Sequence, residues 1–396
     1  MRRGLRVFLI VLLPVMLLAT ACNRGGESGG TDDKKKVKLA FMGPLSGSTA
    51  NLGIPPRNGA QLAIDQANAS GDLDVEIVFE DHDTQGDPAQ ATGLKDQVIP
   101  DEDVIGLIGP VFSGETEAVL PDLEAEGLAM ISPSATRVTL PEKPVKDPKV
   151  FHRVVPHDDV QGAGVVDYIT KVAKLTRIAY VHDNQAYGQA LAEGTESLLK
   201  PAGVTTVGEI LTVNPGESIY SSVVNSIKAA NPPAVYFGGY YDTAGKLANQ
   251  LHAGGYRGLF LGGDGVLDVG FIENAGAAGA EGAVMTCACR LATEDASEEN
   301  LAKFAKDYKA EFKIAPGTYG VEGYDAASIF IEAIKAGNDT REEILSYLEE
   351  DFESFDGLSK KISFEENGNV STGEVLVYQV KEGKLELLGP VSELAG

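Results

Sequence analysis

The chain has 396 residues, of which 43% are hydrophobic and 23% are charged, a composition typical of globular proteins with room for two or three domains. With 58 acidic residues against 33 Lys and Arg, the formal net charge is −25, which argues against binding to nucleic acid or to an anionic lipid surface. Beyond residue 21, no apolar run is long enough to span a bilayer.

Residues 1–22 have the order of a secretory signal peptide. Three arginines precede the apolar run 7–18, and small residues then lead to Cys22. The apolar run has about 12 residues, too few to cross the hydrocarbon core as a helix. A cysteine directly after the small residues resembles bacterial lipoprotein signals, in which that cysteine becomes the lipid-bearing first residue of the mature protein. We therefore expect a signal peptide at 1–21 and lipidation of Cys22; an ordinary cleaved signal with a chance cysteine is the alternative.

Residues 22–36 carry no apolar side chain after the cysteine and predict a flexible tether. From residue 37 onward, short apolar runs alternate with amphipathic segments. The first group predicts strands at 37–42, 75–79, 104–108 and 128–131 and helices at 59–68, 88–98 and 115–126. Such alternation is typical of a parallel sheet covered by helices on both faces.

The same rhythm restarts after residue 156. It predicts helices at 162–172, 189–199, 221–229 and 244–252, with strands at 177–181, 207–211, 234–237 and 259–261. Helices at 301–312, 326–336 and 342–350 and strands at 361–364 and 375–380 follow. Two successive doubly wound sheets predict an α/β protein of two lobes, whose ligand cleft lies where the carboxyl ends of the strands meet.

Cys287 and Cys289 lie two residues apart at what reads as the end of a strand. On one face of a strand, their Cα atoms would sit near the upper limit for a disulfide. We therefore favour free thiols, with a disulfide as the second possibility. A metal site is the third, because no second Cys or His cluster follows at ligand spacing.

Two loops rich in small and hydroxyl residues follow neighbouring strands of the first sheet, at 109–116 and 132–136. The first leads directly into a helix, whose N-terminal N–H groups favour an anion such as a carboxylate. Helix capping by Ser113 or Thr116 would explain one such loop alone. Two loops after adjacent strands favour a binding site.

Three strands of the second sheet are followed by Tyr187, Tyr240 and Asp264, respectively. Tyrosines at strand ends offer an apolar ring with a polar tip. Asp264 is flanked by glycines and has no basic neighbour in sequence, so its carboxylate is available for an ammonium. Turn formation by the Gly-Gly-Asp-Gly segment and surface packing of the tyrosines are the alternatives.

Together, the segments 43–47, 131–136, 182–188, 236–241 and 364–368 resemble the branched-chain amino acid (leucine/isoleucine/valine) binding proteins of ABC importers, which are type I periplasmic binding proteins. The resemblance covers the chain from 37 to about 383. It implies an N-terminal lobe of 37–154 plus 285–370 and a C-terminal lobe of 155–284 plus 374–396. Three crossovers near 154–157, 282–286 and 371–374 would join the lobes.

The resemblance also implies roles for residues of the first lobe. Ser113 and Thr136 match the residues that take the amino acid carboxylate, and the carbonyl of Ala135 matches one that meets the ammonium. Leu52, with Val111 and Phe112, would line the side-chain pocket. Leu52 stands where many members have an aromatic residue, which could admit a larger apolar side chain.

In the second lobe, Tyr187 and Tyr240 match the aromatic residues that close on the ligand. Asp264 falls where the best-known members have Glu facing the ammonium. Because Asp is one methylene shorter, the lobe must close further or hold the ammonium differently. Both departures weaken the assignment to leucine, isoleucine and valine, but leave the amino acid class intact.

The sequence therefore predicts a lipid-anchored, monomeric protein on the extracytoplasmic face of the membrane. It would capture a branched-chain or other apolar L-amino acid and deliver it to an ABC permease, without a cofactor or metal. A receptor or sensor of the same fold for another small amide or carboxylate is the alternative. We expect no enzyme, because the five histidines are scattered and no nucleophile elbow is present.

Overall fold

The computed structural model describes residues 34–141, 149–371 and 373–396. The predicted signal peptide, Cys22 and nearly all of the predicted tether lie outside these ranges. The tether was expected to reach residue 36, but the first strand begins at Lys35, which pairs with Val75 in the sheet. The lysine side chains do not prevent this pairing, because both are exposed. Lys35 forms an ion pair with Asp339, and Lys36 forms one with Glu76.

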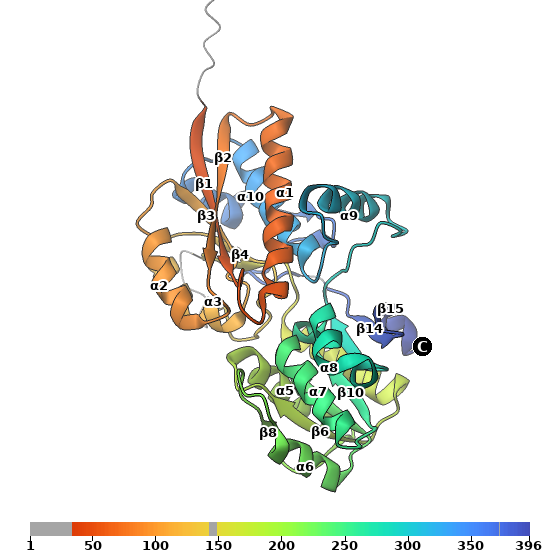
Figure 1. Cartoon of the computed structure of the whole chain (residues 1–396). Coiled ribbons are helices and arrows are strands. Elements are labelled where there is room, and N and C mark those ends of the chain that lie inside the picture. The colour runs from red at the N-terminus through yellow and green to blue at the C-terminus, as the bar shows by residue number, and fades with distance from the viewer. Residues whose placement is uncertain (1–33, 142–148, 372) are drawn as a thin grey trace, which may run out of the picture. The chain divides into compact units, whose positions relative to one another are not determined.

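The first sheet has five parallel strands in the order β2-β1-β3-β4-β5 (Figure 1). They are β1 (Lys35–Gly43), β2 (Val75–Asp83), β3 (Val104–Ile108), β4 (Met130–Ser132) and β5 (Phe151–Arg153). Its helices come from two distant parts of the chain: α1 (Ile54–Ser70), α2 (Pro88–Val98), α3 (Ser113–Ala125), α9 (Glu299–Phe312), α10 (Gly320–Lys335) and α11 (Arg341–Ser346).

The second sheet has the order β15-β14-β11-β10-β9-β6-β7, with β8 also paired to β6. Its strands are β6 (Arg177–His182), β7 (Thr205–Thr206), β8 (Leu211–Thr212), β9 (Ala234–Gly238), β10 (Leu259–Gly262), β11 (Val284–Cys287), β14 (Leu376–Lys381) and β15 (Lys384–Pro390). The helices of this part of the chain are α4 (Asp158–Asp167), α5 (Ala186–Leu199), α6 (Ser221–Ala230), α7 (Tyr241–Ala253) and α8 (Val269–Ala280).

Short elements complete the described chain. They are η1 (Ala50–Leu52), η3 (Asp264–Val266), the π-helical turns η2 (Tyr168–Val172) and η4 (Tyr347–Asp351), β12 (Phe355–Asp356), β13 (Lys361–Ile362) and α12 (Val391–Leu394). None of the helices in the described ranges combines the length and the apolar character that crossing a bilayer demands.

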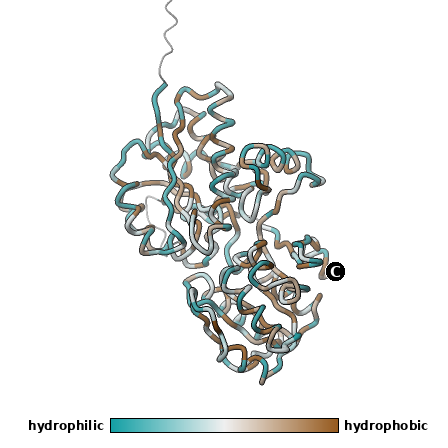
Figure 2. Tube along the Cα trace, in the orientation of Figure 1, coloured by the Kyte–Doolittle hydropathy of each residue, from teal (hydrophilic) through white to brown (hydrophobic). Residues whose placement is uncertain are grey.

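Burial explains why the strands are so apolar. Residues 39–42 of β1 and all of β3 and β9 are buried, because helices cover both faces of each sheet. Hydrophobic and hydrophilic stretches alternate along the chain in both parts (Figure 2). The α/β class and the two doubly wound sheets are therefore confirmed, with one addition: β14 and β15 join the second sheet antiparallel.

Helices α1 and α10 pack with their backbones in contact. A Cβ atom added at Gly59 would lie 2.0 Å from the carbonyl oxygen of Gly320, and one added at Gly323 would lie 2.1 Å from that of Pro56. Only glycine permits this approach. This contact holds α10, which follows the second crossover, against α1, the first helix of the described chain.

Several sequence predictions of elements were wrong in detail. The strand expected at 207–211 is two short strands, β7 and β8, because Gly208 adopts a φ of 79° and interrupts the extended backbone. Helix α8 was not predicted, since its many small residues give no amphipathic pattern. Strand β15 was also missed; it lies at the sheet edge and keeps several polar side chains exposed.

The chain passes between the sheets three times: after β5, after β11 and before β14. Strand β11 pairs within the second sheet as far as Cys287, slightly beyond the expected lobe limit at 284. The division into lobes by residue range stays a prediction.

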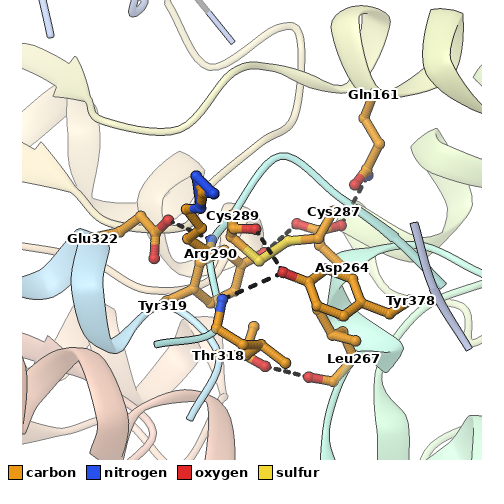
Figure 3. Close-up of a disulfide and its surroundings, with 12 residues drawn as sticks. Gln161, Asp264, Leu267, Cys287, Cys289, Arg290, Thr318, Tyr319, Glu322 and Tyr378 are labelled. Atoms are coloured by element: carbon orange, nitrogen blue, oxygen red, sulfur yellow. Dashed lines mark hydrogen bonds between the residues drawn. A yellow bond between two sulfur atoms is a disulfide. The ribbon is translucent and has the colours of Figure 1, made fainter. Parts of the chain in front are cut away.

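The favoured expectation of free thiols was wrong, because Cys287 and Cys289 form a disulfide (Figure 3). Strand β11 ends at Cys287, and the turning chain brings the two Cα atoms to 5.1 Å. That distance lies within the usual range for a bridge.

Candidate functional site

One small cavity lies where loops from the carboxyl ends of both sheets meet. Its volume is only about 10 Å³, and it is lined by Leu52, Val111, Phe112, Ser113, Ser134, Tyr187, Tyr240, Asp264, Gly265 and Tyr319. Side chains already meet across it: the rings of Phe112 and Tyr240 stack with centroids 4.1 Å apart, and Tyr319 donates a hydrogen bond to Asp264. The structure is therefore a closed form of this site.

The first-sheet side consists of two loops tied to each other. Ser132 Oγ donates to the Pro110 carbonyl at 2.7 Å, and Ser134 Oγ donates to the Val111 carbonyl at 2.7 Å. Ser113 begins α3, and its hydroxyl accepts from the Arg137 amide at 3.2 Å. The pair of loops thus presents hydroxyl groups and a helix N-terminus to the cavity, a surface suited to an anion.

Glu115 holds the start of α3 in place through hydrogen bonds to its carboxyl group. Its carboxyl group accepts from the Phe112 amide at 3.0 Å and from the Thr84 hydroxyl. Burial raises the pKa of Glu115 to about 7. Because its oxygens are engaged in these bonds, Glu115 positions Phe112 and does not itself line the cavity.

Arg153, at the end of β5, organises the loop that contains Ala135 and Thr136. Its guanidinium donates to the carbonyls of Ala135 and Arg137, each at 2.9 Å, and to Asn369 Oδ1 at 2.8 Å. The side chain is fully buried, and burial lowers the pKa of Arg153 to about 10. The Ala135 carbonyl therefore already accepts one hydrogen bond from the protein and keeps one lone pair for a guest.

Asp264 is the centre of the second-sheet side. It is buried and accepts hydrogen bonds from Gln161 Nε2 at 2.9 Å, from the Tyr187 hydroxyl at 2.5 Å and from the Tyr319 hydroxyl. Figure 3 shows Gln161 and Tyr319 reaching the carboxylate from different elements. Burial and the Asp264 carboxylate raise the pKa of both tyrosines well above 10, so both phenols stay protonated donors.

A second buried carboxyl group, Asp158, lies beside this network. It follows the first crossover at the start of α4, and its amide donates to the Thr136 carbonyl at 2.9 Å. Neither of its carboxyl oxygens has a hydrogen-bond partner. Burial and the nearby Asp264 raise the pKa of Asp158 to about 7.

Tyr240 is held by a further carboxyl group, Asp183, which follows β6. Asp183 accepts from the Tyr240 amide at 3.0 Å and from the Gln185 amide at 3.2 Å. Burial raises the pKa of Asp183 to about 7. The ring of Tyr240 then packs between Phe112 and Tyr187, with centroids 5.2 Å from Tyr187.

The structure brings most of the predicted site residues together. Those that line the one cavity are Leu52, Ser113, Tyr187, Tyr240 and Asp264. Ala135 and Thr136 lie in the adjoining loop, which contacts Arg153 and Asp158. The part that each of them plays toward a ligand stays a prediction.

The sequence reasoning missed Asp158, Gln161 and Tyr319. Asp158 and Gln161 follow the first crossover, which was read only as a link between lobes. Tyr319 sits at the start of α10 with a φ of 66°, a left-handed backbone that is uncommon outside glycine. No sequence motif marks these three positions. The place of Asp158 directly after a crossover is the one feature that could have suggested a site residue.

A metal centre finds no support in the part of the chain that the structure describes, where no group of three or more His, Cys, Asp or Glu side chains could hold an ion. The site instead offers hydroxyl and amide groups on one side, carboxylates on the other and apolar walls between them. Such a site suits a small molecule that carries both charges and an apolar part.

Comparisons with known proteins agree with this geometry. Residues 36–384 match the family described as periplasmic binding protein. A Leu/Ile/Val-binding protein of Rhizobium johnstonii is 29% identical over 88% of this chain and 93% of its own length. A Leu/Ile/Val/Thr-binding protein of Salmonella typhimurium is 34% identical over 63% of this chain and 67% of its own.

Among solved structures, one similar protein is the substrate-binding protein of a branched-chain amino acid transporter from Streptococcus pneumoniae, in complex with isoleucine. It is 25% identical, with a TM-score of 0.80 over 90% of this chain and 100% of the other.

Proposed function

The chain belongs to the periplasmic binding protein family, and we propose that it captures a branched-chain or other apolar L-amino acid and delivers it to the permease of an ABC transporter. The observation that carries this proposal is the cavity itself. It places the Asp264 carboxylate opposite the hydroxyl-bearing start of α3, with Leu52 and Val111 as apolar walls. The Leu/Ile/Val-binding relatives support the same ligand class.

The ligand would be oriented by its two charges. Its carboxylate would bind the Ser113 hydroxyl, the Thr136 hydroxyl and the N-terminus of α3, where the helix dipole favours an anion. The Thr136 hydroxyl is buried and has no hydrogen-bond partner, which leaves it available. The ammonium would meet Asp264 and the second lone pair of the Ala135 carbonyl.

Entry of the ligand requires the closed site to open. Phe112 and Tyr240 stack across the cavity, and Tyr319 bonds to Asp264. We propose that the parts contributed by the two sheets separate about the three crossovers, admit the amino acid and close on it. Closure would bury the charges of the ligand and present the loaded form to the permease.

A thermal-shift panel tests this function. Millimolar L-leucine, L-isoleucine or L-valine should raise the melting temperature of the mature protein by mass action, whereas lysine and glutamate should not. A ligand of about nine heavy atoms, at roughly 1 kcal/mol each, could bind with sub-micromolar affinity. The proposal fails if none of the three apolar amino acids shifts the transition.

We further propose that the protein is a monomer held at the extracytoplasmic face of the membrane by a lipid on Cys22, with residues 1–21 removed. It would use no cofactor and catalyse no reaction. The anchor rests on the sequence of residues 1–22, which lie outside the described ranges. Separation of the binding part from the lipid by a polar tether would let the protein reach its permease.

A single substitution tests the anchor. Cys22→Ser removes the thiol that would carry the lipid, so acylation should be abolished and the protein should be released from membranes or remain uncleaved. Fractionation after a high-salt wash measures the outcome. A variant that loses its signal yet stays with the membrane pellet would contradict the lipid anchor.

A further inference from the structure

The site contains two buried carboxyl groups, which differ in their hydrogen bonding. Asp158 and Asp264 are both buried, and Gln161, one turn after Asp158 on α4, donates to Asp264. Asp264 is satisfied by three donors, whereas neither oxygen of Asp158 receives a hydrogen bond from the protein. A buried carboxylate without a partner is costly, and a group in that position becomes protonated instead.

The surroundings of Asp158 do not supply the missing partner. The Thr136 hydroxyl and Arg153 Nη2 are both buried, and neither has a hydrogen-bond partner. The other guanidinium nitrogens of Arg153 bind Ala135, Arg137 and Asn369. The titratable groups that interact with Asp158 are Arg153 of β5, Asp159 of α4, Asp264 of η3 and the phenols of Tyr187, Tyr236, Tyr240 and Tyr319. Among these groups only Arg153 is a cation, and its charge lowers the pKa of Asp158. The charges of Asp264 and Asp159 raise that pKa.

We propose that capture of the ligand's ammonium group releases one proton from Asp158 to solvent. In the closed form without ligand, Asp158 is a neutral acid beside Asp264, whose oxygens accept three hydrogen bonds. An ammonium placed between the two carboxyl groups supplies the missing counter-charge, so Asp158 ionises and holds it together with Asp264. This inference rests on the proposed amino acid ligand and adds a second, pH-dependent carboxylate to its site.

The sign of the pH dependence follows from linkage. Asp158 has a pKa of about 7 without ligand, and the bound ammonium lowers that pKa. Above about pH 7.5, Asp158 is ionised in both states and affinity is constant. As the pH falls below 7, the free site binds a proton that the loaded site excludes, so affinity falls by up to about tenfold per pH unit.

Two other buried acidic groups near the site, Glu115 and Asp183, could titrate in the same range, but both are already hydrogen-bonded within the protein. The oxygens of Glu115 are occupied by Thr84 and the Phe112 amide, and those of Asp183 by the amides of Tyr240 and Gln185. None of the three groups lines the cavity in the closed form, but Asp158 differs from the other two because both of its oxygens lack a hydrogen-bond partner. The proton that leaves on binding is therefore assigned to Asp158.

Isothermal titration calorimetry with L-leucine, L-isoleucine and L-valine at pH 5.5, 6.5 and 8 tests the inference. At pH 6.5, titrations in phosphate and in imidazole buffer, which differ in ionisation enthalpy, count the protons released. Wild type should bind more weakly by about tenfold or more at pH 5.5 than at pH 8, and its heat should depend on the buffer. Asp158→Asn should bind with nearly the same affinity at all three pH values and release no proton.

The comparison of variants makes the test specific. Asp158→Asn should be about tenfold weaker than wild type at pH 8 and within about threefold of it at pH 5.5. Asp159→Asn, a change at the exposed neighbour on α4, should keep the wild-type pH dependence. Wild-type affinity that is flat from pH 5.5 to 8, or a slope that survives in Asp158→Asn, overturns this inference alone. No binding by wild type at pH 8 overturns the proposed function and this inference with it.

Discussion

Replacement of Asp264 by alanine should weaken amino acid binding by about thirtyfold or more. Its carboxylate is buried on the second-sheet side of the cavity, where the ligand's ammonium would be enclosed. Removing one partner of a buried, hydrogen-bonded charge pair costs roughly 2–5 kcal/mol. Calorimetry on the folded variant measures the loss, and Asp264→Glu should be milder because the longer side chain keeps the charge.

A matched variant separates charge from hydrogen bonding. In Asp264→Ala, Gln161, Tyr187 and Tyr319 all lose their common acceptor. Asp264→Asn keeps one carbonyl oxygen for these donors but has no charge. If the negative charge binds the ammonium, asparagine should lose affinity nearly as strongly as alanine, although it keeps an acceptor for the bonds made to one of the two oxygens.

The alternative role of Asp264, shaping its own turn, predicts a different result. The turn is held by backbone bonds, from the Val266 amide to Gly263 and from the Leu267 amide to the Asp264 carbonyl. Because these bonds do not use the side chain, the turn should survive in both variants. Asp264→Ala should nevertheless be less stable without ligand, since the buried donors of Gln161, Tyr187 and Tyr319 lose their acceptor. An affinity within threefold of wild type, together with a lower melting temperature, would exclude Asp264 from the ligand site.

The sequence predicted the parts of this site that follow strands. Ser113, Tyr187, Tyr240 and Asp264 each come just after an apolar run, and parallel strands bring such positions to one edge. That rule works because periodicity marks strands directly. It says nothing of residues that reach the site by tertiary packing.

Tyr319 and Asp158 show where such prediction ends. Tyr319 meets Asp264 across 55 positions of sequence, only because α10 returns to the first sheet and packs its backbone on α1. Asp158 reaches the same network through the first crossover. The disulfide was ranked below free thiols for a similar reason, since the distance was judged on one face of a strand and the chain turns after β11.

Arg153 is the residue on which the first-sheet side of the site depends most. It is fully buried and joins three segments: β5, the loop of residues 135–137 and Asn369 before the last crossover. Arginine serves all three at once because its planar guanidinium has several fixed donors. Each acceptor left without a donor in the interior costs about 1–3 kcal/mol.

Arg153→Met should therefore destabilise the protein by about 3–5 kcal/mol and also weaken ligand binding, because the loop that carries Ala135 and Thr136 loses its support. Arg153→Lys should lie between methionine and wild type, since one ammonium cannot reach all three acceptors in the same geometry. Arg137→Met is the matched control: its side chain pairs with Glu117 at the surface, where an ion pair contributes at most about 1 kcal/mol. Urea unfolding of the four proteins measures the order. Equal stability of Arg153→Met and Arg137→Met would show that the buried guanidinium does not hold the loop.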